Sequence, residues 1–96
     1  MPGATRIGDF CSGHDGWHSR PCITGSSDVF VNDIGSHRVG DLWDIHTRNG
    51  KDPHDALTLD GSPDVFVNDQ LKARIGDAVD CGSIILEGSS DVLVNE

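Results

Sequence analysis

Histidine and cysteine side chains, which are ligands for transition metals, gather in three separate stretches of this 96-residue chain. Imidazole nitrogen and thiolate sulfur form the usual ligand set of a tetrahedral zinc site. If the three stretches converge, imidazoles and a thiol brought together there would make such a four-coordinate site. The first stretch, 10–24, contains His14, His18, Cys11 and Cys22; the second, 42–60, contains His46 and His54; the third, 78–87, contains Cys81.

Each of these side chains also has an ordinary interpretation. A single histidine in a loop is usually only solvated, and His37, which directly precedes Arg38 outside the three stretches, is interpreted as a turn residue. Cys22 is interpreted as a small buried apolar residue. Cys11 either packs in the core or serves as a substitute ligand. A Cys11–Cys22 disulfide is compatible with the spacing, although an odd total of three cysteines does not suggest a disulfide framework.

The sequence offers little support for a catalytic metal. His14 and His18 superficially match the HExxH pattern of zinc proteases, in which a helix presents both histidines and a Glu acts as the base. Here Asp15 replaces that Glu, and the neighbouring glycines and Pro21 disfavour a helix. Asp80 and Glu87 could activate a zinc-bound water, but no sequence feature marks them as buried or paired. We therefore expect no catalytic residue.

The stretches are inserts in a threefold internal repeat. The phrase R(I/V)GD occurs at 6–9, 38–41 and 74–77, and GS(S/P)DV(F/L)VN opens at 25, 61 and 88. Self-similarity at about 30 residues indicates one supersecondary unit used repeatedly. We expect a single domain over 1–96, with repeats at about 5–33, 37–69 and 73–96. The distance between the two phrases varies, so the inserts should leave the framework as loops of different length.

The repeated phrases predict an all-β fold. In DVFVN the valines alternate, which is typical of a strand, while the Phe or Leu between them faces the other way. The closing Asn tolerates the left-handed conformation of a tight turn, and the glycine of RxGD permits positive φ. The Arg and Asp of RxGD could pair across that turn. We expect three units about a pseudo-threefold axis; a solenoid of three rungs is the alternative, which the unequal inserts disfavour.

Composition excludes several classes of function. A formal charge of −9 argues against binding to nucleic acid, which requires a basic surface. No apolar run approaches the roughly 20 residues of a membrane span, and the start MPGATRIGD lacks the apolar stretch of a signal peptide. With 35% hydrophobic residues the core must be thin. A metal would supply the additional stabilisation that so small a domain needs.

Taken together, these phrases resemble the PAAR-repeat proteins, which cap the spikes of contractile injection machines. The resemblance covers essentially the whole chain. It rests on the three RxGD and GSxDVxVN phrases, Gly13-His14, the run 20–23 and Asp80-Cys81-Gly82. The Pro-Ala-Ala-Arg run itself is degraded: Lys72-Ala73-Arg74 keeps only its end.

The resemblance implies a small sharp β-structured cone with a metal near its apex, zinc or alternatively iron, held by three histidines and a cysteine. Carried over by position, the implied ligands are His14, His46, His54 and Cys81. His18 departs from the family pattern and competes with His14 for one coordination position. Four protein ligands would close the site, which implies a structural metal and no enzymatic activity.

The resemblance also implies a partner and a location. The base of the cone would dock on a homotrimeric β-helical spike, one copy per trimer, and sharpen it for piercing a target envelope without stable membrane insertion. Because 96 residues hold no additional toxin domain, we favour a phage tail baseplate over a type VI secretion spike. The competing class is a small zinc-dependent hydrolase or toxin, which would need an open coordination position.

Overall fold

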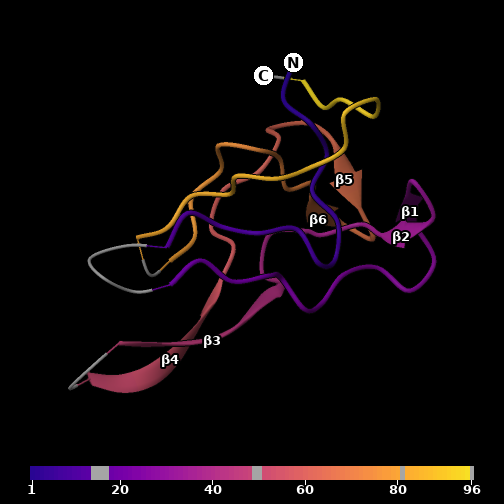
Figure 1. Cartoon of the computed structure of the whole chain (residues 1–96). Helices are drawn as coiled ribbons and strands as arrows, with labels where there is room; N and C mark the ends of the chain where they lie inside the picture. Colours follow the sequence, from indigo (N-terminus) through magenta and orange to yellow (C-terminus); the bar gives the residue numbers. More distant parts are fainter. Residues whose placement is uncertain (14–17, 49–50, 81, 96) are drawn as a thin grey trace.

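The computed structural model describes residues 1–13, 18–48, 51–80 and 82–95, and within 46–48 and 51–54 only the backbone. Across these ranges the chain is all-β and has no helix, as predicted. Six strands form three separate antiparallel hairpins (Figure 1). The strands are β1 (Phe30–Val31), β2 (Ile34–Gly35), β3 (Leu42–Arg48), β4 (Lys51–Leu57), β5 (Phe66–Val67) and β6 (Gln70–Leu71).

The three repeats meet in a closed ring of backbone hydrogen bonds. The residue before each RxGD arginine donates to its counterpart in another repeat: His37 N to Thr5 O at 3.1 Å, Ala73 N to His37 O at 3.2 Å, and Thr5 N to Ala73 O at 3.2 Å. The order is cyclic, each repeat donating once and accepting once. This ring defines the pseudo-threefold axis that the repeats predict, and it is incompatible with a linear solenoid.

A single lysine occupies that axis. Lys72 Nζ donates to the same three carbonyls, of Thr5 at 2.7 Å and of His37 and Ala73 at 2.9 Å. All three protons of the ammonium are therefore used, and Lys72 is 3% exposed. Ala4 and Ser36 precede the other two ring residues and are small. One lysine side chain therefore hydrogen-bonds all three carbonyls on the axis, and the small side chains of Ala4 and Ser36 leave space for it.

The RxGD phrases form the turns that the sequence predicts. The middle glycines have φ of 96° at Gly8, 90° at Gly40 and 93° at Gly76, a region that favours glycine. In every copy the arginine and the aspartate three residues later form an ion pair, at 3.0, 2.7 and 3.0 Å. Each aspartate is nearly buried and also accepts from the backbone N–H of its arginine. The predicted pairing is confirmed.

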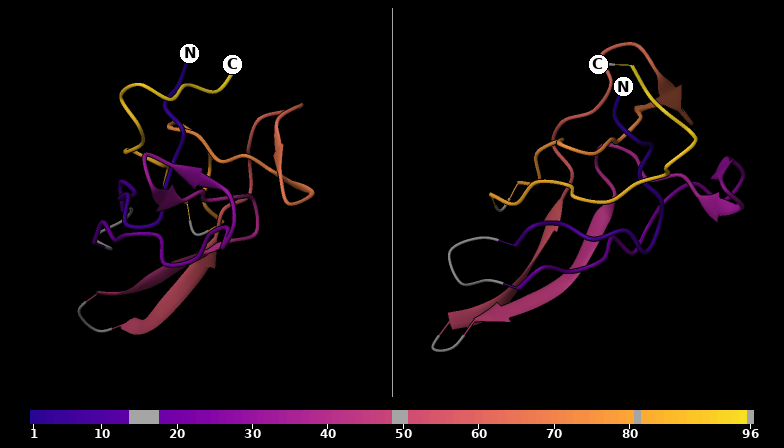
Figure 2. Two further views of the ribbon diagram at one scale, coloured as in Figure 1. Left: turned by 90° about the vertical axis from the view of Figure 1, so that its right-hand side faces the viewer. Right: turned by 45° about the horizontal axis from the view of Figure 1, so that its top comes forward.

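The DVFVN phrases form shorter strands than predicted. β1–β2 and β5–β6 are joined by Asn-Asp loops in which both residues have φ between 51° and 67°, the conformation of a type I′ hairpin turn. In the third repeat the pairing strand comes from the other end of the chain. Leu93 bridges Gly3, and Val94 N donates to Pro2 O at 2.8 Å. The two ends of the chain consequently lie side by side (Figures 1 and 2).

Only one face of these strands is buried. Val31, Val67 and Val94 are 6–7% exposed, but Phe30, Phe66 and Leu93 are 50–60% exposed. Both faces are therefore apolar, as the sequence indicates, but only one of them is buried in the isolated chain. Their second face is available to a partner.

Each insert begins and ends as a hairpin stem. The first bonded pairs are Phe10 with Pro21, Leu42 with Leu57, and Ala78 with Ile84. Inside these stems two layers of three residues, one from each repeat, surround the axis. One layer is Cys22, Thr58 and Ile85; the other is Cys11, Trp43 and Val79; all six are at most 2% exposed. These layers form the thin core that composition predicts.

The molecule is elongated, with principal extents of 39 × 24 × 21 Å. The β3–β4 hairpin forms one extremity and points away from the chain ends and from the short hairpins (Figure 2). No helix of the described residues is long and apolar enough to cross a membrane. The fold therefore has two distinct ends, one made by the repeated phrases and one by the inserts.

Candidate metal centre and docking face

The stems of the three inserts are bonded to one another in a collar. Asp44 N donates to Pro21 O, Asp80 N to Leu57 O, and Ser12 N to Ile84 O, all at 2.9 Å. Each contact joins a different pair of inserts, so the three contacts close around the axis. The collar ends one or two residues before the predicted ligands begin. The described neighbours of those ligands, Ser12, Asp44 and Asp80 among them, thus come from all three inserts.

His46 and His54 are backbone register partners on β3 and β4. The two strands are joined at Asn49-Gly50, a dipeptide typical of hairpin turns. An unbroken ladder from the Arg48–Lys51 pair would set His46 opposite Pro53, so the observed pairing requires a register shift. The ladder has register shifts on both sides of His46. The predicted ligands His14 and Cys81 lie outside the described residues. His18 is described and exposed.

The prediction for His37 is wrong: it is a buried core residue and not a turn residue. It is 0% exposed, and its Nδ1 lies 2.9 Å from Thr24 O, which can only accept. Nδ1 therefore carries the proton, and Nε2 accepts from Thr58 Oγ1 at 2.7 Å. Thr58 Oγ1 in turn accepts from Trp43 Nε1 at 2.8 Å. Burial lowers the pKa of His37 to about 4, so the ring is neutral at pH 7.

The two described cysteines belong to the core. Cys11 and Cys22 are 0% and 1% exposed and do not form a disulfide. Burial raises the pKa of Cys22 to about 12, so it stays a thiol, and its Sγ donates to Arg6 O at 3.0 Å. The interpretation of Cys22 as a small buried residue is confirmed. Cys11 packs in the core, as the first of its two interpretations states.

The carboxylates considered as catalytic bases have structural partners. Glu87 Oε1 accepts from Phe10 N at 2.8 Å, and Asp80 Oδ1 accepts from Leu57 N at 3.1 Å. Both contacts tie one insert stem to the next. Among the described side chains, no three His, Cys, Asp or Glu residues are grouped so that they could hold a metal. Any metal site must accordingly include ligands from the remaining residues, where the four predicted ligands lie.

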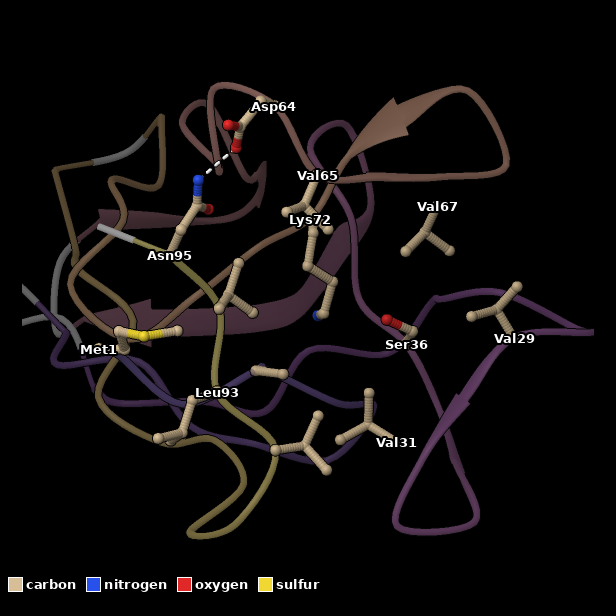
Figure 3. A pocket seen from close by; sticks show the side chains of 13 residues that line it. Met1, Val29, Val31, Ser36, Asp64, Val65, Val67, Lys72, Leu93 and Asn95 are labelled. Atoms are coloured by element: carbon tan, nitrogen blue, oxygen red, sulfur yellow. Dashed lines mark hydrogen bonds between the residues drawn. The ribbon is translucent and has the colours of Figure 1, made fainter.

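The opposite end of the axis is hollowed. A cavity of about 480 Å³ opens there, walled by valines from all three repeats (Figure 3). Val31, Val67 and Val94 form its inner wall, with Ser36 and Lys72 among the residues that line it. Three cross-repeat pairs surround this end: Asn32 donates to Asp91, Asn68 to Asp28, and Asn95 to Asp64. These hydrogen bonds lower the pKa of Asp28 and Asp91, so those carboxylates are ionised at pH 7.

Sequence reasoning missed the axial role of Lys72 and the burial of His37. Both residues fall at or next to the position before the RxGD arginine, but no local pattern in the sequence marks either of them as buried. Chemically, the insert end can hold a metal if the predicted ligands converge, while the opposite end is a concave apolar face suited to docking.

Comparison with known proteins identifies the family of the chain. No curated protein matches the chain significantly. The family model described as PAAR motif matches residues 12–87. That match includes the second and third inserts, the first insert from residue 12 on, and two of the three DV(F/L)VN phrases, which is well over half of the chain. Members of this family act as spike tips in contractile injection systems. The chain belongs to the PAAR motif family, and its role is that of a spike-tip protein.

Proposed function

We propose that one copy of this chain caps one homotrimeric β-helical spike and sharpens it for piercing a target envelope. The observation that carries the proposal is the closed ring of Thr5, His37 and Ala73 around Lys72. A monomer with an approximate threefold axis can meet three identical chains evenly, and one without such an axis cannot. Phage tail baseplates and type VI secretion systems are both possible settings, and we favour the phage tail.

The apolar face at the DVFVN end is the proposed contact. Phe30, Phe66 and Leu93 occupy equivalent positions in the three repeats and expose half or more of their surface. Exposed apolar side chains repeated at such positions are typical of an interface. The inserts would then point away from the spike, toward the target.

Orientation is tested by site-specific cross-linking. A photoreactive residue at Leu93 should cross-link to a trimeric spike protein from the same genome. The same residue at Ile45, which is 60% exposed on β3, should not. Both positions are exposed and apolar, so they form a matched pair. Cross-linking through Ile45 and not through Leu93 would reverse the proposed orientation.

We further propose that the insert end holds one structural zinc through His14, His46, His54 and Cys81. Two observations support the fit. The register sets His46 opposite His54, and Cβ atoms of directly opposed residues are about 5 Å apart in antiparallel ladders. The collar also brings the chain segments next to all four ligands together. Three imidazoles and one thiolate suit zinc, and iron is the alternative metal.

The zinc would crosslink the three inserts on the side of the collar that faces away from the core. A closed set of four protein ligands leaves no place for the activated water that hydrolysis needs, so we propose that the chain is not an enzyme. Absorption spectroscopy of the cobalt-substituted protein should show four protein ligands in tetrahedral geometry. A spectrum with water in one position would favour the alternative function, a small metal-dependent hydrolase.

A further inference from the structure

The cavity on the axis has walls that only a partner can cover. Each repeat contributes two valines, one nearly buried and one at the rim. The rim residues Val29, Val65 and Val92 are 38–39% exposed. A cavity of about 480 Å³ would hold on the order of ten waters, and the valine side chains offer those waters no hydrogen bond. Filling it with apolar groups would release that water and stabilise a complex.

The threefold arrangement of the cavity walls indicates how many side chains of a partner enter the cavity. The valine pairs are related by the pseudo-threefold axis, so a trimer on the same axis presents one equivalent side chain to each pair. One third of the cavity, about 160 Å³, is available to each chain. That space is large enough for one apolar side chain from each chain. A small single ligand would not match three equivalent walls.

The rim carries a complementary charge. Asp28, Asp64 and Asp91 surround the cavity, one from each repeat, and each accepts from an asparagine of another repeat. Each of the three carboxylates also accepts a hydrogen bond from the serine two residues before it, which fixes its position. The rim is therefore a ring of three ordered carboxylates, which a basic ring on the partner would complement.

One polar group at the cavity lacks a partner. Ser36 is 0% exposed, and its Oγ has no hydrogen-bond partner among the residues that the structure describes. Ser36 lines the cavity, and its hydroxyl points toward the centre of the view in Figure 3. A buried hydroxyl without a partner costs about 1–3 kcal/mol. Because this hydroxyl is fully buried, an entering side chain does not reach it, and the recognition of a partner depends on the valine walls and the rim.

We propose that the cavity is a socket for three apolar side chains, one from each chain of the spike trimer. Lysine or arginine residues of the spike face the three rim carboxylates. The inference rests on the proposed trimeric partner and names the chemistry by which that partner is recognised.

The socket is tested by filling it. Val65→Trp places a large ring over the cavity at a residue that is already 39% exposed, so the fold should tolerate it. Leu59→Trp makes a similar change at a residue that is 57% exposed and does not line the cavity. Binding to the full-length trimeric spike protein from the same genome is measured by calorimetry. We expect Val65→Trp to weaken binding at least 100-fold and Leu59→Trp to change it less than threefold.

Three further variants make the outcome decisive. Val92→Trp fills the same cavity from another repeat and should match Val65→Trp, which covers the case in which one variant fails to fold. Ser36→Ala should change binding less than threefold, because its buried hydroxyl does not contact the partner. Asp28→Asn should reduce the dependence of binding on salt. Tight binding by both tryptophan variants would overturn the socket and leave the spike-tip role intact. Absence of binding by the unmodified chain would overturn the proposed partner as well.

Discussion

The axial ring and the inserts differ in how the three repeats are used. At the ring the repeats contribute equivalent backbone groups, and a single asymmetric side chain, Lys72, satisfies all of them. At the inserts the repeats contribute hairpins of unequal length and different residue types. Backbone hydrogen bonds hold the first region, and we propose that side-chain ligands to a metal hold the second. Repetition thus builds the symmetric end, where we propose the docking face, and divergence builds the insert end, where we propose the metal.

The largest expected effect comes from removing the metal. Replacing Cys81 and His54 together (Cys81→Ser with His54→Ala) should abolish stoichiometric metal content. It should also lower the apparent free energy of unfolding by more than about 5 kcal/mol, since structural zinc sites contribute about 10 kcal/mol or more. Metal analysis and denaturant titration measure both quantities.

A matched set of single variants assigns the ligands. Cys22→Ser alters a buried cysteine outside the proposed site and should retain metal. His14→Ala should lose it, and His18→Ala should keep it. If His14→Ala retains the metal and His18→Ala loses it, His18 and not His14 is the ligand. Unchanged metal content in the Cys81/His54 double variant would remove the proposed ligand set.

The next effect concerns the axis. Lys72→Ala removes three hydrogen bonds and the stem that fills the centre of the ring, so we expect a loss of about 4 kcal/mol. Lys72→Met keeps most of the stem and should lose less. The two variants separate packing from hydrogen bonding. If both are as stable as the unmodified chain, the ammonium does not hold the ring together.

A comparable effect is expected within the second repeat. Thr58→Val leaves the buried Trp43 Nε1 donor and His37 Nε2 acceptor without partners, which should cost about 3 kcal/mol. Ile85 is the equivalent core residue of the third repeat, and Ile85→Val should cost only about 1 kcal/mol. Thermal unfolding of both variants provides the measurement. Equal losses would show that the hydrogen-bond chain adds nothing to packing.

The smallest expected effect is a dependence on pH. The pKa of His37 is about 4 in the fold and 6.5 in the unfolded chain, so the unfolded state binds the proton first as pH falls. Stability should be complete above pH 6.5 and decline by up to about 3 kcal/mol as pH approaches 4. The lowered pKa values of Asp28, Asp41 and Asp91 act at more acidic pH. The difference between the unmodified chain and His37→Gln isolates this contribution, and identical pH profiles would exclude it.

The repeated phrases made much of the fold predictable. Three copies of RxGD fixed the turns and their ion pairs, because glycine with positive φ and charges three residues apart are local features. The axial ring was not predictable, because it joins residues more than 30 positions apart through backbone atoms. Lys72 and His37 were missed for the same reason: a lysine or histidine in a turn-rich segment has no local mark of burial.

The proposed metal ligands could be predicted from the sequence only in part. Their residue types and their place in equivalent inserts indicated a site, and the register of His46 with His54 agrees with convergence. Their coordination nevertheless depends on the ends of hairpins of unequal length, whose geometry no local pattern specifies. For that reason the ligand set stays a prediction while the fold is established.

Native mass spectrometry of the chain mixed with the proposed trimeric spike protein counts the chains in the complex directly. One spectrum reports the number of chains of each kind and any retained metal ion. We expect a single assembly of three spike chains, one tip chain and one zinc ion. Three tip chains on each trimer, or a complex that forms equally well with a metal-free tip, would contradict it.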